Sequence, residues 1–565
     1  MDQKMLPVGV DNFKKIREQN YFYVDKSMLI KELLDKRAEV NLFIRPRRFG
    51  KTLNMSMLRC YFEDAGDPAV NESNRCLFSG LDIMDAGERY TEQMGVYPVI
   101  TLSLKSAKQP SFSSACYKLC DELWREYERH GYVISTLSGS RKQQYEEILK
   151  RRASLDAYSG SLRFLSEVLQ EYHGKPVIIL IDEYDVPLEN AYWSGFYDEM
   201  VGFIRSLFES ALKTNPCLAF AVITGCLRIS RESIFTGLNN LNVISILSSQ
   251  YDEYFGFTPT EVDQMLHYYG KEGKRVIIKE WYDGYRFGNA AVYNPWSVIN
   301  YVMDLISDDN ALPSPYWANT SSNSIIKNLV ERADASVKQE LELLIAGGTI
   351  EKQVHEDITY DSIYDSEDSL WNFLFFTGYL KQISRRLEEE NQYITMALPN
   401  MEVKYIYKNT ITKWFRDEVK SQDLSHLYQA ILSGDASAFQ KELSALLQRG
   451  ISYMDNQEAF YHGFLMGVLG NMRDYFVKSN REGGNGRLDI VIRHPDVTHT
   501  PVVLELKISN TFKGMEDACR KALDQIDEKG YDDWLPEEGY SDVWNYGIAF
   551  FRKQCRVMVK YKELL

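Results

Sequence analysis

A Gly-Lys-Thr tripeptide at residues 50–52 is the first place where the residue types suggest chemistry. In a phosphate-binding loop, backbone N–H groups and the positive end of the following helix face an anion. The lysine reaches the outer phosphates and the hydroxyl holds Mg²⁺. Lys51 and Thr52 supply those two side chains. The general pattern also has glycine five residues before Gly50, where this chain has Arg45. The alternative interpretation is a basic surface turn that ends a strand.

Two adjacent carboxylates, Asp182 and Glu183, supply the second half of this chemistry. They lie within residues 175–185, KPVIILIDEYD, where a nearly continuous apolar run predicts a strand buried on both faces of a parallel sheet. Open α/β sheets bind ligands at the carboxyl ends of such strands. There Asp182 could hold the water shell of Mg²⁺ and Glu183 could polarise the attacking water, with Asp185 as the next candidate base. Together the two motifs predict binding of a nucleoside triphosphate.

A third set of charged residues, Asp489, Glu505 and Lys507, lies near the carboxyl terminus. Glu505 and Lys507 are two apart in the apolar segment 501–508, so in a strand they point to the same face. Asp489 belongs to the alternating segment 486–492, and a short turn between the two strands would bring it beside Glu505. Two carboxylates that hold a metal and a lysine that positions the nucleophile are what a Mg²⁺-dependent phosphodiesterase needs. The alternative is a row of charges on an exposed edge hairpin.

The elements that must position these residues follow from hydrophobic periodicity. Short apolar runs predict strands at residues 41–44, 97–104, 175–182 and 217–224. Helical spacing follows residue 52 and dominates residues 112–172. Strands that alternate with helices predict a parallel α/β sheet. Further on we expect a helical lid or winged segment that closes on the nucleotide at 251–330, an acidic helical stretch at 331–390 and amphipathic helices at 400–450.

Length and composition limit the number of domains and the classes of partner that the chain can have. A chain of 565 residues exceeds a single core and predicts several domains, for which we expect the boundaries 1–250, 251–394 and 395–565. The net charge of -15 argues against broad attraction to nucleic acid but leaves room for a local basic groove. Scattered cysteines without CxxC pairs predict reduced thiols in a cytoplasm. No apolar run has the length of a membrane helix, so no membrane partner is expected.

Several sequence blocks resemble the AAA-ATPase-like family of bacterial proteins, over nearly the whole chain. These blocks are RPRRFGKT, LIDEYDVPL, TGCLRIS, YFGFT, WYDGYRFG, YNPWSVINY and YWANTSSN. The resemblance implies an α/β chain with an amino-terminal P-loop ATPase domain and a carboxy-terminal PD-(D/E)xK nuclease-superfamily domain. Members of this family tend to have arginine-rich loops before Gly-Lys-Thr, so Arg45 departs from the general P-loop rather than from this family. The WYDGYRFG block suits a tightly packed turn and has no chemistry that the residues themselves indicate.

The residues and the resemblance together give a set of candidate sites with ATP and Mg²⁺ as cofactors. The residues assigned to the nucleotide are Arg48, Phe49, Gly50, Lys51, Thr52, Leu53, Asp182 and Arg228. The residues assigned to catalysis are Glu183, Asp489, Glu505 and Lys507. The residues assigned to the metal are Thr52, Asp182, Glu458, Asp489 and Glu505, of which Glu458 rests on the resemblance alone.

The expected roles of four residues, Arg228 among them, are less specific. Arg228 and Arg231 follow a predicted strand, where either could sense the γ-phosphate or brace the loop, or both could be solvated. The resemblance places Gln525 at an auxiliary position of the nuclease domain. His462 shares a helix face with Glu458 and is expected to be a packed or capping residue.

Three functions fit these observations. The first is an ATP-regulated, Mg²⁺-dependent nuclease that acts on nucleic acid, on DNA rather than RNA. The second is an ATP-switched signalling protein whose carboxy-terminal domain binds a partner or nucleic acid without cleaving it. The third, a small-molecule kinase, fits the P-loop but leaves the second acidic set unexplained. The sequence leaves the oligomeric state open, with a homo-oligomer as one option.

Overall fold

The computed structural model describes most of the chain in two compact units. The described residues are 3–228, 234–235, 239–317, 335–356, 366–409, 423–449, 458–470, 472, 474–483 and 486–564. The first unit combines residues 1–322 with 351–404, and the second combines 323–350 with 405–565. Within the described ranges, no helix is both long enough and apolar enough to cross a membrane. The predicted domain boundaries at 250 and 394 stay predictions.

Five parallel strands form the main sheet of the first unit, in the order β2-β3-β4-β1-β5. Their bounds are β1 (Val40–Ile44), β2 (Val99–Ser103), β3 (Val177–Asp182), β4 (Leu218–Gly225) and β5 (Leu241–Ile244). Every residue of β1 and β3 is buried, because helices cover both faces of the sheet. One strand, β4, separates the strand that leads into Gly50 from the strand that ends in Asp182.

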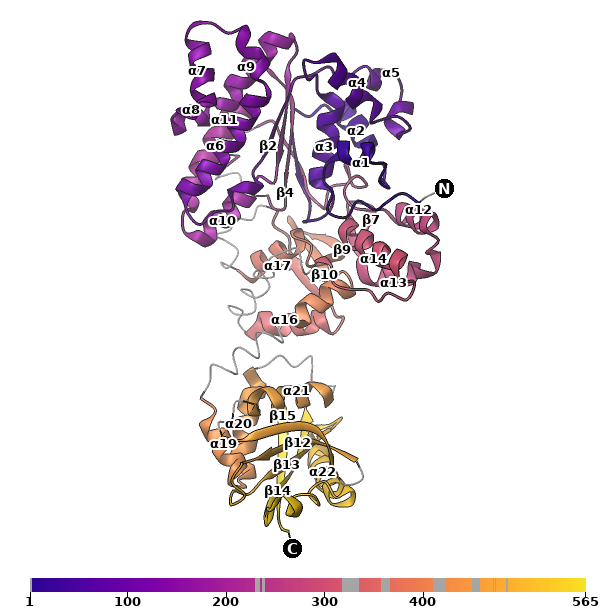
Figure 1. Cartoon of the computed structure of the whole chain (residues 1–565), viewed down its shortest axis with the longest axis vertical. Helices are drawn as coiled ribbons and strands as arrows, with labels where there is room; N and C mark the ends of the chain where they lie inside the picture. The colour runs from indigo at the N-terminus through magenta and orange to yellow at the C-terminus, as the bar shows by residue number, and fades with distance from the viewer. Residues whose placement is uncertain are drawn as a thin grey trace. The chain divides into compact units, whose positions relative to one another are not determined.

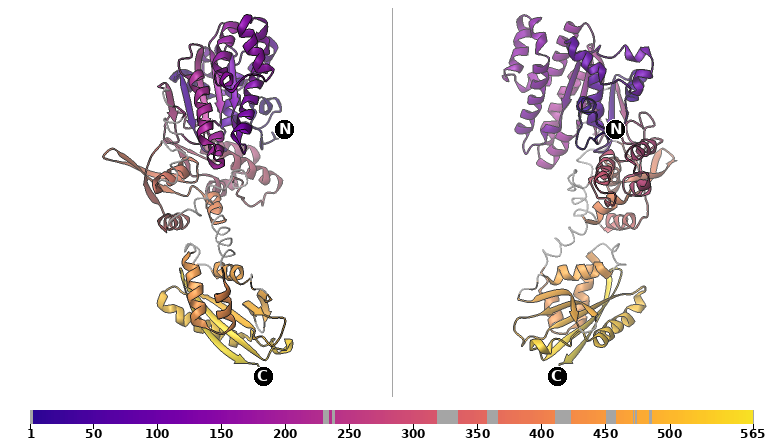
Figure 2. Two further views of the ribbon diagram at one scale, coloured as in Figure 1. Left: turned by 90° about the vertical axis from the view of Figure 1, so that its left-hand side faces the viewer. Right: turned by 45° about the vertical axis from the view of Figure 1, so that its right-hand side comes forward.

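Helices lie in two groups on the two faces of this sheet, as Figures 1 and 2 show. One group is α1 (Phe13–Glu18), α2 (Met28–Lys36), α3 (Lys51–Phe62), α4 (Pro68–Cys76) and α5 (Glu88–Thr91). The other is α6 (Phe112–Arg129), α7 (Gly139–Leu149), α8 (Leu155–Ser159), α9 (Ser161–His173), α10 (Val186–Ser194) and α11 (Tyr197–Leu212).

A smaller helical region follows the main sheet and belongs to the same unit. It contains α12 (Pro259–Tyr269), α13 (Arg275–Tyr282), the hairpin β6 (Tyr285–Phe287) and β7 (Ala290–Val292), and α14 (Pro295–Ser307). The three helices share an apolar core that also includes Leu6 from the amino-terminal segment. This core ties residues at the start of the chain to residues that follow the main sheet.

The expectation of a helical stretch at residues 331–390 is wrong in part. Helices α16 (Ala335–Ile345) and α17 (Glu367–Phe376) lie there, but so do strands β8 (Ile350–Gln353) and β9 (Lys381–Glu388). β9 pairs with β10 (Asn391–Ala397) in an antiparallel hairpin, and Glu389 takes a left-handed φ of 53° in the turn. The Lys, Arg, Leu and Glu residues of β9 favour helix by propensity, but pairing with β10 outweighs that weak preference.

The second unit is a mixed sheet with helices on both faces (Figure 1). Its strand order is β11-β12-β13-β14-β15, with β13 and β14 parallel and the other pairs antiparallel. The strands are β11 (Phe476–Gly483), β12 (Gly486–Arg493), β13 (Val502–Ile508), β14 (Asp542–Phe551) and β15 (Gln554–Glu563). The helices are α19 (Ser425–Leu432), α20 (Ala436–Arg449), α21 (Glu458–Leu469) and α22 (Met515–Lys529).

Alternation along β12 and β13 decides which residues face which helices. Ile490 and Leu504 pack with α19, α20 and α21, whereas Val491 and Val503 pack with Ile526 of α22. Because side chains alternate along a strand, residues 489, 505 and 507 share the α22 side. The predicted α/β fold class, with a parallel-sheet domain, a helical middle region and a carboxy-terminal α/β domain, is confirmed.

Candidate functional site

The loop between β1 and α3 has the geometry of an anion-binding turn. Gly50 has a left-handed φ of 82°, and α3 begins at the next residue. Lys51 is only 5% exposed, and its Nζ donates hydrogen bonds of 2.9 Å to the carbonyls of Arg45 and Pro46. The Lys51 ammonium group therefore lies inside the loop, bonded to its backbone. It also lies at the amino terminus of α3, where the free backbone N–H groups of a helix attract an anion.

Arg45, which replaces the first glycine of the general pattern, is fully buried. Its guanidinium donates to the carbonyls of Ile44 and Ile244 at 3.0 and 2.9 Å. It also lies over the rings of Phe255 and Phe287, 5.2 and 5.0 Å from their centroids. Burial lowers the pKa of this guanidinium to about 9. Arg45 is thus a structural cation that fixes the loop to the protein interior.

The hydroxyl of the loop meets the acidic strand at Asp182. Thr52 Oγ1 donates to Asp182 Oδ2 at 2.7 Å, and Thr224 Oγ1 from the intervening strand β4 donates to Asp182 Oδ1 at 2.5 Å. The amide of Glu183 in turn donates to Thr224 Oγ1 at 3.2 Å. Sequence reasoning missed Thr224, although its place at the end of β4 was a usable signal. The fold therefore brings together the two residues predicted to hold Mg²⁺ beside the nucleotide.

The two carboxylates that follow Asp182 have different surroundings. Glu183 has a left-handed φ of 53°, which is uncommon for a residue with a side chain, and burial raises the pKa of its carboxyl. Asp185 is 3% exposed and accepts hydrogen bonds from the amides of Cys226 and Leu227 at 2.7 and 3.1 Å. Asp185 therefore holds the loop after β4, which leaves Glu183 as the better candidate base.

Arg228 lies in that same loop after β4. Its side chain is 15% exposed, and Nη1 lies 3.8 Å from Glu356 Oε2. Glu356 also accepts a hydrogen bond from Ser245 at 3.3 Å. The proposed contact of Arg228 with phosphate stays a prediction. Arg231 lies outside the described residues.

The WYDGYRFG block packs against the phosphate loop through its aromatic rings. Phe49 is fully buried, and its ring lies 4.9 Å from that of Tyr285 and 5.2 Å from that of Phe287. Gly284 has a φ of 99°, and a Cβ there would lie 2.1 Å from the carbonyl oxygen of Pro399. The predicted tight turn is present, and its aromatic rings form part of the support for the loop.

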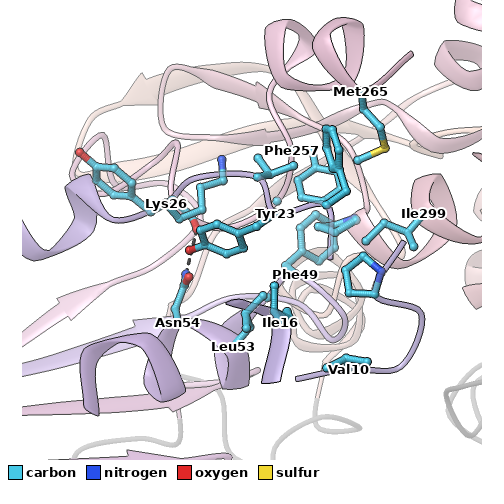
Figure 3. A pocket seen from close by; sticks show the side chains of 17 residues that line it. Val10, Ile16, Tyr23, Lys26, Phe49, Leu53, Asn54, Phe257, Met265 and Ile299 are labelled. Atoms are coloured by element: carbon cyan, nitrogen blue, oxygen red, sulfur yellow. Dashed lines mark hydrogen bonds between the residues drawn. The ribbon is translucent and has the colours of Figure 1, made fainter. Parts of the chain in front are cut away.

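An apolar cavity of about 80 Å³ lies next to this loop, between the amino-terminal segment and the region after the main sheet (Figure 3). Polar side chains at its wall are already bonded: Lys26 Nζ lies 2.6 Å from Glu261, and Asn54 donates to the Tyr254 carbonyl at 2.9 Å. The residues that line it include Val10, Ile16, Phe22, Phe49, Gly50, Leu53, Phe257, Met265, Pro295 and Ile299. Leu53 of α3 lies at the cavity wall, and its predicted contact with the nucleotide stays a prediction.

The carboxy-terminal acidic set assembles on β12 and β13. The strands pair with Ile490 opposite Leu504, so Asp489 faces Glu505 one step further along the register. Asp489 Oδ2 accepts a hydrogen bond from the amide of Leu506 at 2.8 Å. Lys507 Nζ lies 2.9 Å from Glu505 Oε1. The hairpin is not an exposed edge, because Glu505 is only 2% exposed and β13 is the central strand of the sheet.

Two neighbouring helices contact this set. Gln525 of α22 donates to Glu505 Oε1 at 2.5 Å and to the Tyr531 hydroxyl at 3.2 Å. His462 of α21 has its Nε2 3.0 Å from the carbonyl oxygen of Asp489, which fits a packed, positioning role. Glu458 begins α21, and its side chain lies outside the described residues.

The donor sets fit Mg²⁺ rather than a metal held entirely by protein ligands. In the ranges that the structure describes, no three His, Cys, Asp or Glu side chains gather as a metal site. Among the described side chains, Thr52 and Asp182 supply oxygen atoms at one candidate position, and Asp489 and Glu505 supply them at the other. Mg²⁺ keeps several waters and is commonly bound through one or two carboxylates and a substrate phosphate. Two protein ligands at each position are therefore sufficient.

Comparison with known proteins agrees with this arrangement. Residues 7–235 match the AAA-ATPase-like family, described as a predicted AAA-ATPase, and residues 456–560 match the PD-(D/E)XK nuclease superfamily. The chain therefore has an AAA-ATPase-like domain followed by a domain of that nuclease superfamily. It is also similar to an uncharacterized protein in the vnfD 5′ region of Azotobacter chroococcum mcd 1. The two are 26% identical over 567 residues, which is 99% of this chain and 98% of that protein.

Proposed function

We propose that the first unit binds and hydrolyses ATP with Mg²⁺. The hydrogen bond between Thr52 and Asp182 carries this proposal, because it joins the hydroxyl of the phosphate loop to the strand-end carboxylate. Mg²⁺, when bound, would balance charge on the outer phosphates. Lys51 would exchange its two carbonyl partners for phosphate oxygens, and Glu183 would orient and deprotonate the attacking water. The mostly apolar cavity beside Gly50 offers a site for the base, and the one lysine at its wall, Lys26, is already paired with Glu261.

We propose further that the carboxy-terminal domain cleaves nucleic acid, with DNA preferred to RNA, in a cytoplasmic protein. The shared face of Asp489, Glu505 and Lys507 on paired strands supports this proposal. Mg²⁺ bound by the two carboxylates would counter the charge of the scissile phosphate. Lys507 would then position the nucleophile or stabilise the charge that develops on the phosphate, while Gln525 holds Glu505 in place.

A cleavage assay on the full chain tests both halves. Plasmid, linear duplex, single-stranded DNA and RNA are incubated with Mg²⁺, with and without ATP, and ATP turnover is followed in parallel. We expect cleavage that disappears in Asp489→Asn and persists in Asp517→Asn, a matched change at an exposed ion pair with Lys521. ATP turnover without cleavage of any substrate would contradict the nuclease and favour an ATP-switched protein that only binds its partner.

A further inference from the structure

Three arginines in the phosphate loop have three different environments. Arg45 is buried and bonded to backbone carbonyls, and Arg47 forms an ion pair with Glu189 of α10. The guanidinium of Arg48 instead lies 4.3 Å from the ring centroid of Trp296. Arg48 also has a left-handed φ of 70°, which a residue with a side chain keeps only where its surroundings hold it there. Arg48 is therefore placed on an aromatic surface by the loop that carries it.

Trp296 is a fixed surface rather than a mobile side chain. It lies in the first turn of α14, where Asn294 caps the helix by accepting hydrogen bonds from the amides of Trp296 and Ser297 at 3.0 and 3.4 Å. Its indole Nε1 donates to the carbonyl of Tyr316 at 3.3 Å. Backbone and ring are thus both anchored, and neither anchor involves the phosphate loop.

The electrostatic surroundings of Arg48 suit a cation that gains a second partner. Burial lowers the pKa of its guanidinium, whereas the nearby charge of Glu183 opposes that shift. A contact with an aromatic ring is weaker than a charge-assisted hydrogen bond to phosphate. The ring holds one face of the guanidinium, and the N–H groups at its edge can donate to a phosphate that enters the loop while the ring contact persists.

We propose that Arg48 binds the terminal phosphate of ATP and that Trp296 is the positioning residue that presents Arg48 to it. The proposal rests on the proposed ATP binding and adds its regulation. Because Trp296 lies in the first turn of α14, the presence of the terminal phosphate is transmitted to the helical region after the main sheet. ADP lacks that phosphate, so Arg48 gains no such contact from it.

Calorimetric titration of the full chain with ATP and with ADP tests this pairing. In Trp296→Leu the ATP affinity should fall about threefold to tenfold, because Arg48 is then no longer held in place before the phosphate binds, while ADP affinity stays within about twofold. Trp296→Phe, which keeps a ring, should lose less. Arg48→Lys keeps the charge but not the planar stacking, so it should show the same selective loss of ATP affinity. This variant also tests the proposal if Trp296→Leu does not fold.

Tryptophan fluorescence supplies a second readout. ATP, and not ADP, should change an emission component that is absent from Trp296→Phe and present in Trp281→Phe, a matched loss of one indole from α13. Equal losses of ATP and ADP affinity in Trp296→Leu, or no loss of either, would overturn the inference while leaving ATP binding intact. A wild-type chain that binds no ATP refutes the proposed function itself and this inference with it.

Discussion

At the scale of single residues, substitution of Glu183 is the most direct test of the chemistry proposed for the first unit. Glu183→Gln keeps the size of the side chain and removes the base, so ATP affinity should stay within about twofold while turnover falls on the order of 10²-fold or more. Steady-state turnover and calorimetry on the same preparation measure the two effects. The control is Glu92→Gln, an exposed carboxylate. Unchanged turnover would make Glu183 a structural residue.

The environment of Glu183 also sets the pH dependence of turnover. A base acts only when it is deprotonated, and burial raises the pKa of this carboxyl. The rising limb of turnover against pH should therefore lie above the ordinary range of a glutamate. A limb at the ordinary value would indicate that another group accepts the proton.

Glu402 gives a prediction about stability. It is fully buried, accepts hydrogen bonds from Ser297 Oγ and the amide of Trp317, and burial raises the pKa of its carboxyl to about 7. The folded state therefore favours the protonated form. The contribution of Glu402 to the free energy of unfolding is fully present below the pKa of the unfolded state, about 4.5. It is lost as the pH rises through the folded-state pKa of about 7.

The expected loss in unfolding free energy between pH 5 and pH 8 is on the order of 2 kcal/mol. Glu402→Gln should flatten this pH dependence, whereas Glu390→Gln, an exposed change, should not. Urea unfolding of the full chain at pH 5 and at pH 8 measures this difference in the free energy of unfolding for the wild type and both variants. Parallel pH profiles for wild type and Glu402→Gln would contradict the assignment.

At the scale of elements, the turn at Gly284 leads from α13 into β6, where Tyr285 packs against Phe49 of the phosphate loop. A Cβ at Gly284 would clash with the Pro399 carbonyl, and its φ of 99° disfavours any side chain. Gly284→Ala should therefore destabilise the first unit by roughly 2 kcal/mol or more and weaken ATP binding. Gly273→Ala is the matched control, because a Cβ there meets no atom within 4 Å. Melting temperature and ATP affinity are the readouts, and equal effects of the two variants would refute the bracing role.

The sequence predicted elements better than it predicted contacts between them. β1, β3, β4, β12 and β13 follow from apolar runs of strand length. Asp182 follows from its position at the end of β3, whereas the shared face of Glu505 and Lys507 follows from alternation along β13. The β9–β10 hairpin was missed because its charged residues have helix propensity and gain strand structure only through pairing. The contacts of Phe49 with Tyr285 and of Arg48 with Trp296 join distant parts of the chain. Periodicity and local motifs contain no information about such pairs.

At the scale of the whole molecule, the chain has two predicted catalytic sites in separate compact units. Lys51→Ala should abolish measurable ATP binding, since each charge-assisted phosphate contact contributes roughly 1.5–3 kcal/mol, and should leave the fold intact. Asp489→Asn should keep ATP turnover while losing cleavage and the rise of melting temperature with Mg²⁺ that comes from the second unit. Assays of both activities on both variants test this. Loss of cleavage in Lys51→Ala would show that ATP controls the nuclease, and loss of ATP turnover in Asp489→Asn would contradict two independent sites.

The support of Phe49 by Tyr285, and of the Gly284 turn by Pro399, has a consequence for the making of the protein. The ribosome produces the phosphate loop early and its supports only later, after a delay on the order of tens of seconds at ordinary elongation rates. Phe49 and Arg45 lack their aromatic partners until residue 287 has left the ribosome, and the Gly284 turn lacks its support until Pro399 follows. We therefore expect a chain whose synthesis stops before that point to lack the proposed ATP binding, which would begin only when the first unit is complete.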